Sequence, residues 1–250
     1  MQKPLEGKVA LVSGAGRNIG RAIALFLAED GAAVIVNGRA DTAALDAVVD
    51  EIRAAGGRAM AARADVSKPD EVARMVTDGV GAFGGLDIVV SNAGLRRQTA
   101  FLDMTLAEWR EILSVALDGA FILTQAAVPH LMARGGGSVI GLSGISHHVG
   151  VANRCHVSAS KAGLEGLMRA LAVELGPHGI RCNCISPGSI DTVRGAAAGA
   201  RPGTLGERNI PAGRKGTVEE IAGLVRHLAG PYGAYITGQT LHVNGGAFLT

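Results

Sequence analysis

The chain contains few aromatic residues and has no surplus of charge of one sign. Of its 250 residues, 3% are aromatic, and 24 lysines and arginines against 22 aspartates and glutamates give a formal net charge of +2. This balance argues against a basic nucleic-acid-binding stripe and against an acidic tail. The scarcity of aromatic side chains argues against base-stacking platforms. We therefore expect no nucleic-acid partner.

Cysteine is also scarce. Cys155, Cys182 and Cys184 are an odd number without a C-x-x-C pair, so neither a disulfide framework nor a cysteine zinc site is indicated. Cys182 and Cys184 alternate within a strand pattern and are expected to face the core. We find no apolar run of membrane-spanning length, and residues 1–4 do not begin a signal peptide. We expect a soluble, cytoplasmic protein with no membrane partner.

Glycine, in contrast, is abundant, with 37 residues. Residues 9–20 join an apolar run, Val-Ala-Leu-Val, to the segment Ser-Gly-Ala-Gly-Arg-Asn-Ile-Gly, and a second strand pattern at 33–37 lies at βαβ distance. Gly14 and Gly16 allow a tight turn, and Gly20 allows the following helix to pack closely. Free N–H groups and the helix dipole would face a pyrophosphate there. The alternative is a tight strand-to-helix turn without a ligand.

Strand and helix patterns alternate to the end of the chain without a linker. They predict one α/β domain over 1–250, a Rossmann-type doubly wound parallel sheet with helices on both faces. Strands are expected at 9–12, 33–37, 58–64, 86–90, 138–143, 181–186 and 240–243. Helices are expected at 42–55, from 68–70 to 84–85, at 105–134 with Thr105 and Glu108 as a capping box, and at 218–229. Residues 190–216, rich in glycine, alanine, arginine and proline, are predicted to be a mobile substrate lid.

The end of the second strand indicates which dinucleotide would bind. An acidic residue there would hold a ribose 2′-hydroxyl, whereas arginine accommodates a 2′-phosphate. This chain has the uncharged Asn37, and Arg17 and Arg39 can both reach the region. We predict NADP(H) as the cofactor, with NAD(H) as the alternative. Either arginine could instead be a solvated surface residue.

The chain resembles the short-chain dehydrogenase/reductase family over essentially its whole length. The motifs that carry the resemblance are Ser13–Gly20, Asp65-Val66, Asn92-Ala93-Gly94, Ser158–Gly163, Pro187–Thr192 and Tyr235–Gln239. The resemblance implies that the first turn holds the pyrophosphate, that Asp65 contacts adenine, and that Pro187–Thr192 touches the nicotinamide. It also implies a homo-oligomer, a dimer or tetramer, formed through the helices at 105–134 and after Lys161.

The candidate cofactor-binding residues come from these motifs together with the second-strand arginine. They are Gly14, Gly16, Arg17, Asn18, Ile19, Gly20, Arg39, Asp65, Val66, Asn92, Ala93, Gly94, Lys161, Pro187, Gly188, Ile190 and Thr192.

The resemblance fails at the catalytic positions. The family uses a tyrosine as proton donor or acceptor, a lysine four residues later, a serine that holds the substrate oxygen, and an asparagine in the long helix. Lys161 is present, but Val157 stands four residues before it. Counting without gaps places the serine position on Gly144 and the asparagine position on Ala116. The chain is therefore predicted to be an atypical member that lacks an ordinary ketoreductase mechanism.

Other polar residues surround the missing positions. The candidate catalytic residues are Lys161, His156, His148 and Ser143, with His156 or His148 as a surrogate acid because imidazole titrates near neutrality. His147 and His148 are expected to lie in a loop, and the histidines could equally be only solvated. No metal site is predicted, because neither a helical i, i+4 histidine pair nor a nearby carboxylate completes the cluster.

Three arginines in this part of the sequence, Arg96, Arg97 and Arg154, could bind an anionic small-molecule substrate or could be surface residues.

These observations lead to three functional hypotheses. The first is an atypical NADP(H)-dependent oxidoreductase acting on a small carbonyl, enoyl or acyl-type substrate; reduction of a conjugated carbon–carbon double bond would not need the usual tyrosine. The second is a non-redox lyase, hydratase or isomerase on the same fold. The third is a non-catalytic nucleotide-binding protein. The fold alone does not decide among them.

Overall fold

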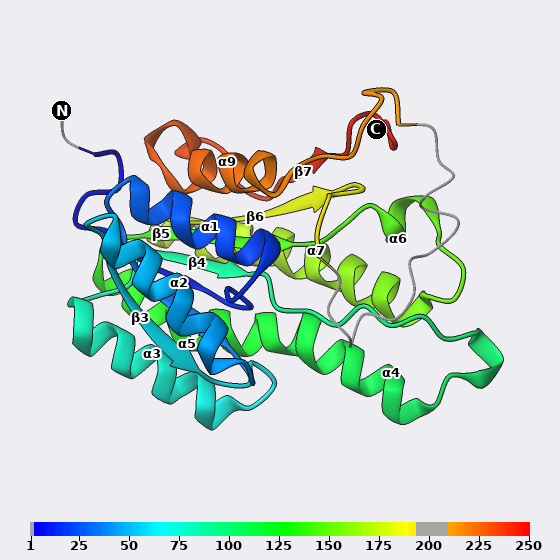
Figure 1. Ribbon diagram of the computed structural model, residues 1–250, viewed down its shortest axis with the longest axis horizontal. Coiled ribbons are helices and arrows are strands. Elements are labelled where there is room, and N and C mark those ends of the chain that lie inside the picture. The colour runs from blue at the N-terminus through cyan, green and yellow to red at the C-terminus, as the bar shows by residue number, and fades with distance from the viewer. Residues whose placement is uncertain (1–2, 194–209) are drawn as a thin grey trace.

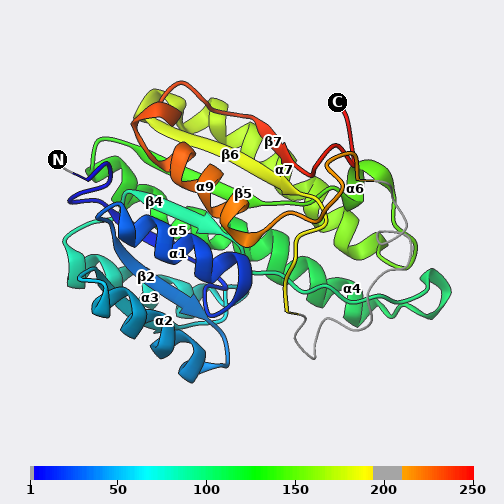
Figure 2. The same ribbon diagram turned by 45° about the horizontal axis from the view of Figure 1, so that its top comes forward.

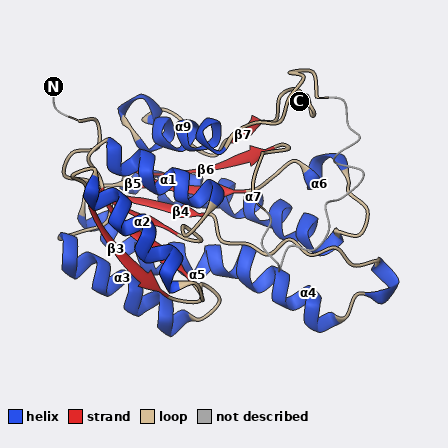
Figure 3. Cartoon of the chain, in the orientation of Figure 1, coloured by secondary structure: helices blue, strands red, loops and turns tan. Residues whose placement is uncertain are grey.

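The computed structural model describes residues 3–193 and 210–250, and it contains one seven-stranded sheet in which all neighbouring strands are parallel (Figures 1 and 3). The strand order is β3-β2-β1-β4-β5-β6-β7. The strands are β1 (Val9–Val12), β2 (Ala33–Gly38), β3 (Arg58–Arg63), β4 (Ile88–Ser91), β5 (Gly137–Leu142), β6 (Ile180–Pro187) and β7 (Thr240–Val243). The order reverses between β1 and β4, so the predicted doubly wound α/β sheet is confirmed.

Helices cover both faces of this sheet (Figure 2). They are α1 (Asn18–Glu29), α2 (Thr42–Ala54), α3 (Pro69–Phe83), α4 (Leu106–Leu113), α5 (Gly119–Ala133), α6 (Ser146–Val149), α7 (Cys155–Leu175) and α9 (Val218–Ala229). One core joins the sheet to α1, α2 and α9, and the other joins it to α3, α5 and α7. In β1, Ala10 and Val12 belong to the first core and Val9 and Leu11 to the second. A strand covered on both faces is apolar throughout for this reason.

The predicted helix over 105–134 forms, but it is not uniform. A π-helical turn, Ser114–Asp118, separates α4 from α5. The helix from Leu106 to Ala133 is apolar enough by length and composition to cross a membrane; an 18-residue window within it has a mean hydropathy of 1.6, and 44% of that window is buried. The expectation of no such run is thus wrong. Core helices pass the same test, and α5 packs Leu123 and Leu131 fully buried against the sheet core.

Two local predictions near this helix also need correction. Thr105 Oγ1 accepts a hydrogen bond from the Glu108 N–H, but the Glu108 carboxylate does not return to the cap. It accepts a hydrogen bond from Thr99 Oγ1 at 2.6 Å and lies 3.3 Å from His156 Nε2. The loop expected at His147 and His148 is the short helix α6.

Part of the predicted lid lies outside the described residues, namely 194–209. Of the rest, Ile190 forms an isolated parallel bridge with Gly216, and the Asp191 N–H donates to the Gly216 carbonyl oxygen at 2.8 Å. The two described ends of the segment are therefore paired with each other.

A buried carboxylate just before β4 ties the amino-terminal edge of the sheet together. Asp87 accepts hydrogen bonds from the Val9 N–H (3.0 Å), Lys8 Nζ (3.0 Å) and Arg134 Nε (3.2 Å), and its side chain is 4% exposed. It thereby joins β1, β4 and the end of α5.

We expect Asp87→Ala to lower the free energy of unfolding by about 2 kcal/mol, because the buried Val9 N–H loses its partner while the two partly exposed cations keep water. Urea denaturation measures this change. Asp46→Ala, on the exposed side of α2, is the matched control and should change stability by no more than about 0.5 kcal/mol. Equal effects of the two substitutions would contradict the assigned role of Asp87.

Candidate functional site

The glycine turn follows β1 at the point where the strand order reverses. Gly14 has φ +63°, a left-handed conformation that favours glycine. A Cβ at Gly20 would lie 2.2 Å from the Gly14 carbonyl oxygen, so α1 approaches the turn as closely as its backbone allows. The turn thus presents bare backbone at the amino end of a helix, which is the geometry that suits a phosphate group.

Asn92, directly after β4, holds this turn in place. Its Nδ2 donates to the Ser13 and Gly14 carbonyl oxygens, each at 3.0 Å. In the other direction, Ser13 Oγ accepts from the Asn92 N–H at 3.0 Å and from the Ala93 N–H at 3.1 Å. These four hydrogen bonds, together with those from the Ser13 N–H and Oγ to the Val90 carbonyl oxygen at 2.9 and 3.3 Å, join the carboxyl ends of β1 and β4.

Asn18 occupies the place in the turn where glycine is usual. It has φ +50°, a left-handed conformation that asparagine tolerates better than most side chains. Its side chain exchanges two hydrogen bonds with the Val193 backbone, at 2.8 and 3.0 Å. Asn18 thus links the first turn to the segment after β6.

The ends of β2 and β3 form the other side of the candidate cofactor site. The Asn37 amide is buried and donates to the Ala62 and Ala64 carbonyl oxygens at 3.0 and 3.1 Å, so it is occupied within the sheet. The Arg39 side chain is 56% exposed and lies 3.6 Å from Asp65 Oδ2. Burial alone would raise the pKa of Asp65, but hydrogen bonds from Ser67 and the charge of Arg39 lower it.

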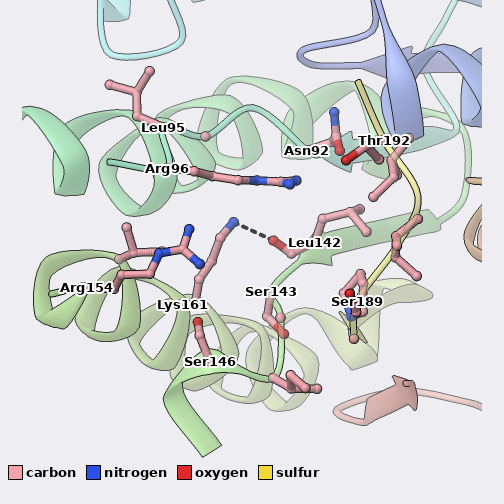
Figure 4. A pocket seen from close by; sticks show the side chains of 18 of the residues that line it. Asn92, Leu95, Arg96, Leu142, Ser143, Ser146, Arg154, Lys161, Ser189 and Thr192 are labelled. Atoms are coloured by element: carbon pink, nitrogen blue, oxygen red, sulfur yellow. Dashed lines mark hydrogen bonds between the residues drawn. The ribbon is translucent and has the colours of Figure 1, made fainter. Parts of the chain in front are cut away.

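A cavity of about 210 Å³ opens at the carboxyl ends of β4, β5 and β6 (Figure 4). Eight of the candidate cofactor residues line it, namely Ile19, Asn92, Gly94, Lys161, Pro187, Gly188, Ile190 and Thr192. The other nine do not; they are Gly14, Gly16, Arg17, Asn18, Gly20, Arg39, Asp65, Val66 and Ala93. Most of these nine belong to the glycine turn or to the ends of β2 and β3.

The charged side chains that line the cavity are all basic. Arg96, Arg154, Lys161 and Lys215 line it, and none of its described lining residues is an aspartate, glutamate, histidine, cysteine or tyrosine. Figure 4 shows Lys161 between Arg96 and Arg154, with its Nζ donating to the Leu142 carbonyl oxygen at 2.5 Å. Burial and then the charge of Arg96 lower the pKa of Lys161 to about 8. Such a cavity favours binding of an anion. It also lowers the pKa of Lys161 to a value near neutral pH.

The three positions that the resemblance to the family predicted to be catalytic lie at or near this cavity. Val157 and Gly144 line it. Ala116 is buried in the π-helical turn and does not line it; a Cβ at Gly94, which does line the cavity, would lie 4.0 Å from Ala116 Cβ and 3.6 Å from Lys161 Nζ.

His156 is separated from the cavity. It is fully buried, its Nδ1 accepts from the Val157 N–H at 3.0 Å, and its Nε2 lies 3.3 Å from Glu108 Oε1. Both ring nitrogens thus face protein groups, and His156 is not among the described residues that line the cavity. The placement leaves His156 without a direct route to a substrate in the cavity.

Ser143 lines the cavity, but its hydroxyl is hydrogen-bonded to Glu165, which does not line the cavity. Ser143 Oγ donates to Glu165 Oε1 at 2.7 Å, and His148 Nε2 lies 3.2 Å from the same oxygen. Burial would raise the pKa of Glu165, but the adjacent His147 imidazole and the hydrogen bond from Ser143 lower it to about 2. Burial, and then His148, lower the pKa of His242 beside this group.

Glu165 lies next to the candidate site, and the sequence analysis did not identify it. It lies four residues after Lys161, so it projects from the same stretch of α7, and an acidic residue among apolar neighbours was the available signal. Of the three candidate arginines, Arg96 and Arg154 line the cavity, whereas Arg97 pairs with Glu111 through two hydrogen bonds.

Comparisons with known proteins agree with this geometry. A family described as Enoyl-(Acyl carrier protein) reductase matches residues 14–247. A 3-oxoacyl-[acyl-carrier-protein] reductase of Synechocystis sp. is 39% identical over 246 residues, 98% of each chain. An L-rhamnose 1-dehydrogenase (NAD(P)(+)) of Sphingomonas sp. is 40% identical over 250 residues, 99% of this chain and 98% of the other.

Solved structures are similar over the same length. A dehydrogenase/reductase from Sinorhizobium meliloti has a TM-score of 0.91 and 38% identity, over 99% of this chain and 98% of the other. A short chain dehydrogenase from Burkholderia cenocepacia in complex with NADP has a TM-score of 0.90 and 37% identity, over 98% and 99%.

The lowered pKa of Lys161 predicts a pH-dependent stability difference. The folded-state pKa of about 8 lies below the unfolded value of 10.5, so at pH 7 folding opposes the charge of this lysine. We expect Lys161→Met to raise the free energy of unfolding at pH 7 by about 1–2 kcal/mol, less than the full shift because the ammonium faces a hydrated cavity. This gain should shrink as pH rises from about 8 to 10.5.

Urea denaturation at pH 7 and at pH 10 measures the change. Lys3→Met, in the exposed N-terminal segment, controls for the general effect of removing a lysine. A gain for Lys161→Met that stays constant or grows with pH would contradict the lowered pKa.

Proposed function

Because the chain belongs to the short-chain dehydrogenase/reductase family, we propose that it is an NADP(H)-dependent oxidoreductase with a non-standard catalytic site and a small anionic carbonyl, enoyl or acyl-type substrate. The observation that carries the proposal is the position of Lys161. It lies in one cavity with Asn92, which anchors the glycine turn, and with two arginines.

The residues present fit a dinucleotide. The bare backbone at Gly14 and Gly20 forms a cradle that a Cβ would fill, and the amino end of α1 favours a pyrophosphate there. The cavity of about 210 Å³ is too small for a whole dinucleotide. The nicotinamide end would lie against Pro187 and Thr192, and the adenosine end would extend toward Asp65.

Two features favour NADP(H) over NAD(H). Arg39 stands at the end of β2 with more than half of its side chain exposed, and Arg17 is exposed in the turn before α1. Asn37, where an acidic residue would hold a ribose 2′-hydroxyl, is buried and occupied by the carbonyl oxygens of β3 and the residue after it. The site thus offers cations for a 2′-phosphate, whereas the Asn37 amide is already used within the sheet.

We expect Arg39→Asp to weaken NADPH binding by about 10- to 100-fold, because a charge-assisted hydrogen bond is lost and a repulsive charge is added. NADH affinity should change by less than about threefold. Nicotinamide fluorescence titration gives both dissociation constants. Arg74→Asp, on the exposed side of α3, is the control and should leave both nearly unchanged. Equal loss of NADPH and NADH affinity would contradict the assignment of Arg39.

The chemistry at the substrate end depends on Lys161. When bound, NADPH would supply a hydride for reduction. With Val157 in place of a phenol, Lys161 Nζ is a proton carrier in the cavity wall, and its lowered pKa of about 8 leaves it mostly protonated at pH 7. The ammonium would donate its proton to the substrate oxygen as negative charge develops there. Arg96 and Arg154 would hold the anionic group of the substrate.

Val157 also supports the alternative hypotheses. A cavity without the family's phenol suits a non-redox lyase, hydratase or isomerase, or a nucleotide-binding protein without catalysis. His148 as an acid or base belongs to the non-redox alternative; it does not line the cavity and reaches it only through Glu165 and Ser143. His156 is withdrawn from the proposal because it faces Glu108.

Restoring the phenol tests the oxidoreductase proposal. We expect Val157→Tyr to raise kcat/KM for NADPH-dependent reduction of 3-oxoacyl substrates by about 100-fold, the lower end of the contribution of about 100- to 10,000-fold that a positioned acid makes. Val157→Phe fills the same volume without a hydroxyl and should show no gain. NADPH absorbance measures the rate.

The wild type separates the three hypotheses in the same assay. NADPH oxidation with a keto or enoyl substrate supports the oxidoreductase. Tight NADPH binding without oxidation in the wild type or in Val157→Tyr supports the non-catalytic protein. No binding of NADPH or NADH contradicts both and leaves a non-redox enzyme.

We also propose a homo-oligomer. Apolar side chains on the outward side of the α4–α5 helix and of α7 remain exposed, among them Leu106, Phe121 and Val173 at 61%, 48% and 81%. Apolar surface on neighbouring helices favours burial against a second copy. Cytoplasmic location and a substrate lid at 190–216 likewise stay predictions.

A further inference from the structure

The wall behind the cavity contains a cluster that the proposed reaction does not use. His147 and His148, on α6, meet Glu165 of α7, and their nearest ligand atoms all lie within 4.8 Å of one another. His147 Nε2 is 3.1 Å and His148 Nε2 is 3.2 Å from Glu165 Oε1. The carboxylate that is not near the histidines along the sequence is thus brought to them by the fold.

We propose that His147, His148 and Glu165 form a binding site for one Zn²⁺ ion. Two imidazoles and one carboxylate are a donor set that zinc accepts, with bonds of about 2.0–2.2 Å. In tetrahedral geometry such bonds separate neighbouring ligand atoms by about 3.3 Å. The two measured nitrogen–oxygen distances, 3.1 and 3.2 Å, are close to that separation.

The state of His147 supports a missing partner. Its side chain is only 8% exposed, and neither Nδ1 nor Nε2 makes a hydrogen bond within the described residues, although Nε2 lies close to Glu165. A buried imidazole whose ring nitrogens make no hydrogen bond is costly, on the order of 1–3 kcal/mol. A cation bound between the two side chains would satisfy one ring nitrogen and the carboxylate together.

The residues around this cluster also support metal binding. Ser143 Oγ donates to Glu165 Oε1 at 2.7 Å and would orient the carboxylate as an outer-shell partner. His148 stacks on Phe248, with ring centroids 4.9 Å apart, so the C-terminal segment covers this side near α6 (Figure 1). The fourth position is open to water or to His242, whose Nδ1 is buried without a hydrogen bond within the described residues.

Arg169 is the competing cation. Its NH1 lies 3.8 Å from Glu165 Oε2, but the side chain is 57% exposed and approaches the oxygen that the histidines do not share. It can therefore move into water without a buried charge being left behind. The site would fix the segment from Ser143 to Val149 against α7, and so the cavity wall.

Metal titration of the full chain tests the proposal. The protein is treated with chelator and titrated with Co²⁺, whose visible absorption reports its coordination, and then with Zn²⁺ in competition. We expect one Co²⁺ per chain, displaced by one Zn²⁺, with absorption typical of four or five ligands. Zn²⁺ should also raise the thermal unfolding midpoint.

Substitutions of the proposed ligands test where the ion binds. Glu165→Gln and His147→Asn should each weaken Zn²⁺ binding by about 100-fold or more, since even outer-shell partners cost about 10- to 100-fold. His178→Asn, an exposed histidine outside the cluster, is the control and should bind as the wild type does. Circular dichroism checks that each variant folds. If Glu165→Gln does not fold, His147→Asn alone tests the location of the ion.

Two results would overturn the assignment: no stoichiometric binding to the wild type, or equal Zn²⁺ affinity in the wild type, the His147→Asn variant and the His178→Asn variant.

Discussion

The junction between β1 and β4 is the constraint on which the candidate site depends. The strand order reverses there, so no crossover helix closes the carboxyl edge of the sheet at that point. Asn92 and Ser13 hold the two strand ends together with hydrogen bonds of 3.0–3.1 Å. Because the Asn92 amide is used in this way, the glycine turn is fixed before any ligand binds, and the cavity that Asn92 lines begins where the turn ends.

Most of the fold could be predicted from the sequence because its elements are local and strongly patterned. The observed strand Val9–Val12, helix Val218–Ala229 and strand Thr240–Val243 have the predicted bounds. Parallel strands buried on both faces are apolar throughout, and glycine or proline marks several helix ends, as at Pro69 and Gly84. These signals need only short stretches of chain.

The capping-box prediction was wrong because of contacts between distant residues. Thr105 and Glu108 have the spacing of a capping box, but Thr99 and His156 compete for the Glu108 carboxylate. His156 lies 48 positions after Glu108, and spacing within one helix contains no information about that contact. His156 has the position along the chain expected for a surrogate acid, but it is fully buried and is not among the described residues that line the cavity.

Glu165 was missed for the same reason, because its contacts also join residues far apart in the sequence. Seventeen residues separate it from His148, so no local motif joins them. Yet α6 and α7 pack together, and both histidines reach one carboxylate oxygen. Ser143 contacts that oxygen from the cavity side. The wall of the cavity and the cluster behind it are therefore coupled through a single buried side chain.

The charge of the cavity connects substrate choice to proton transfer. Arg96 helps to lower the pKa of Lys161, and no acidic side chain among the described lining residues opposes it. An anionic substrate on Arg96 and Arg154 would offset those charges and raise the lysine pKa again. The proton would then be held on Lys161 while substrate is bound and given up when charge develops on the substrate oxygen. The same arginines would thus select the substrate and set when the lysine releases its proton.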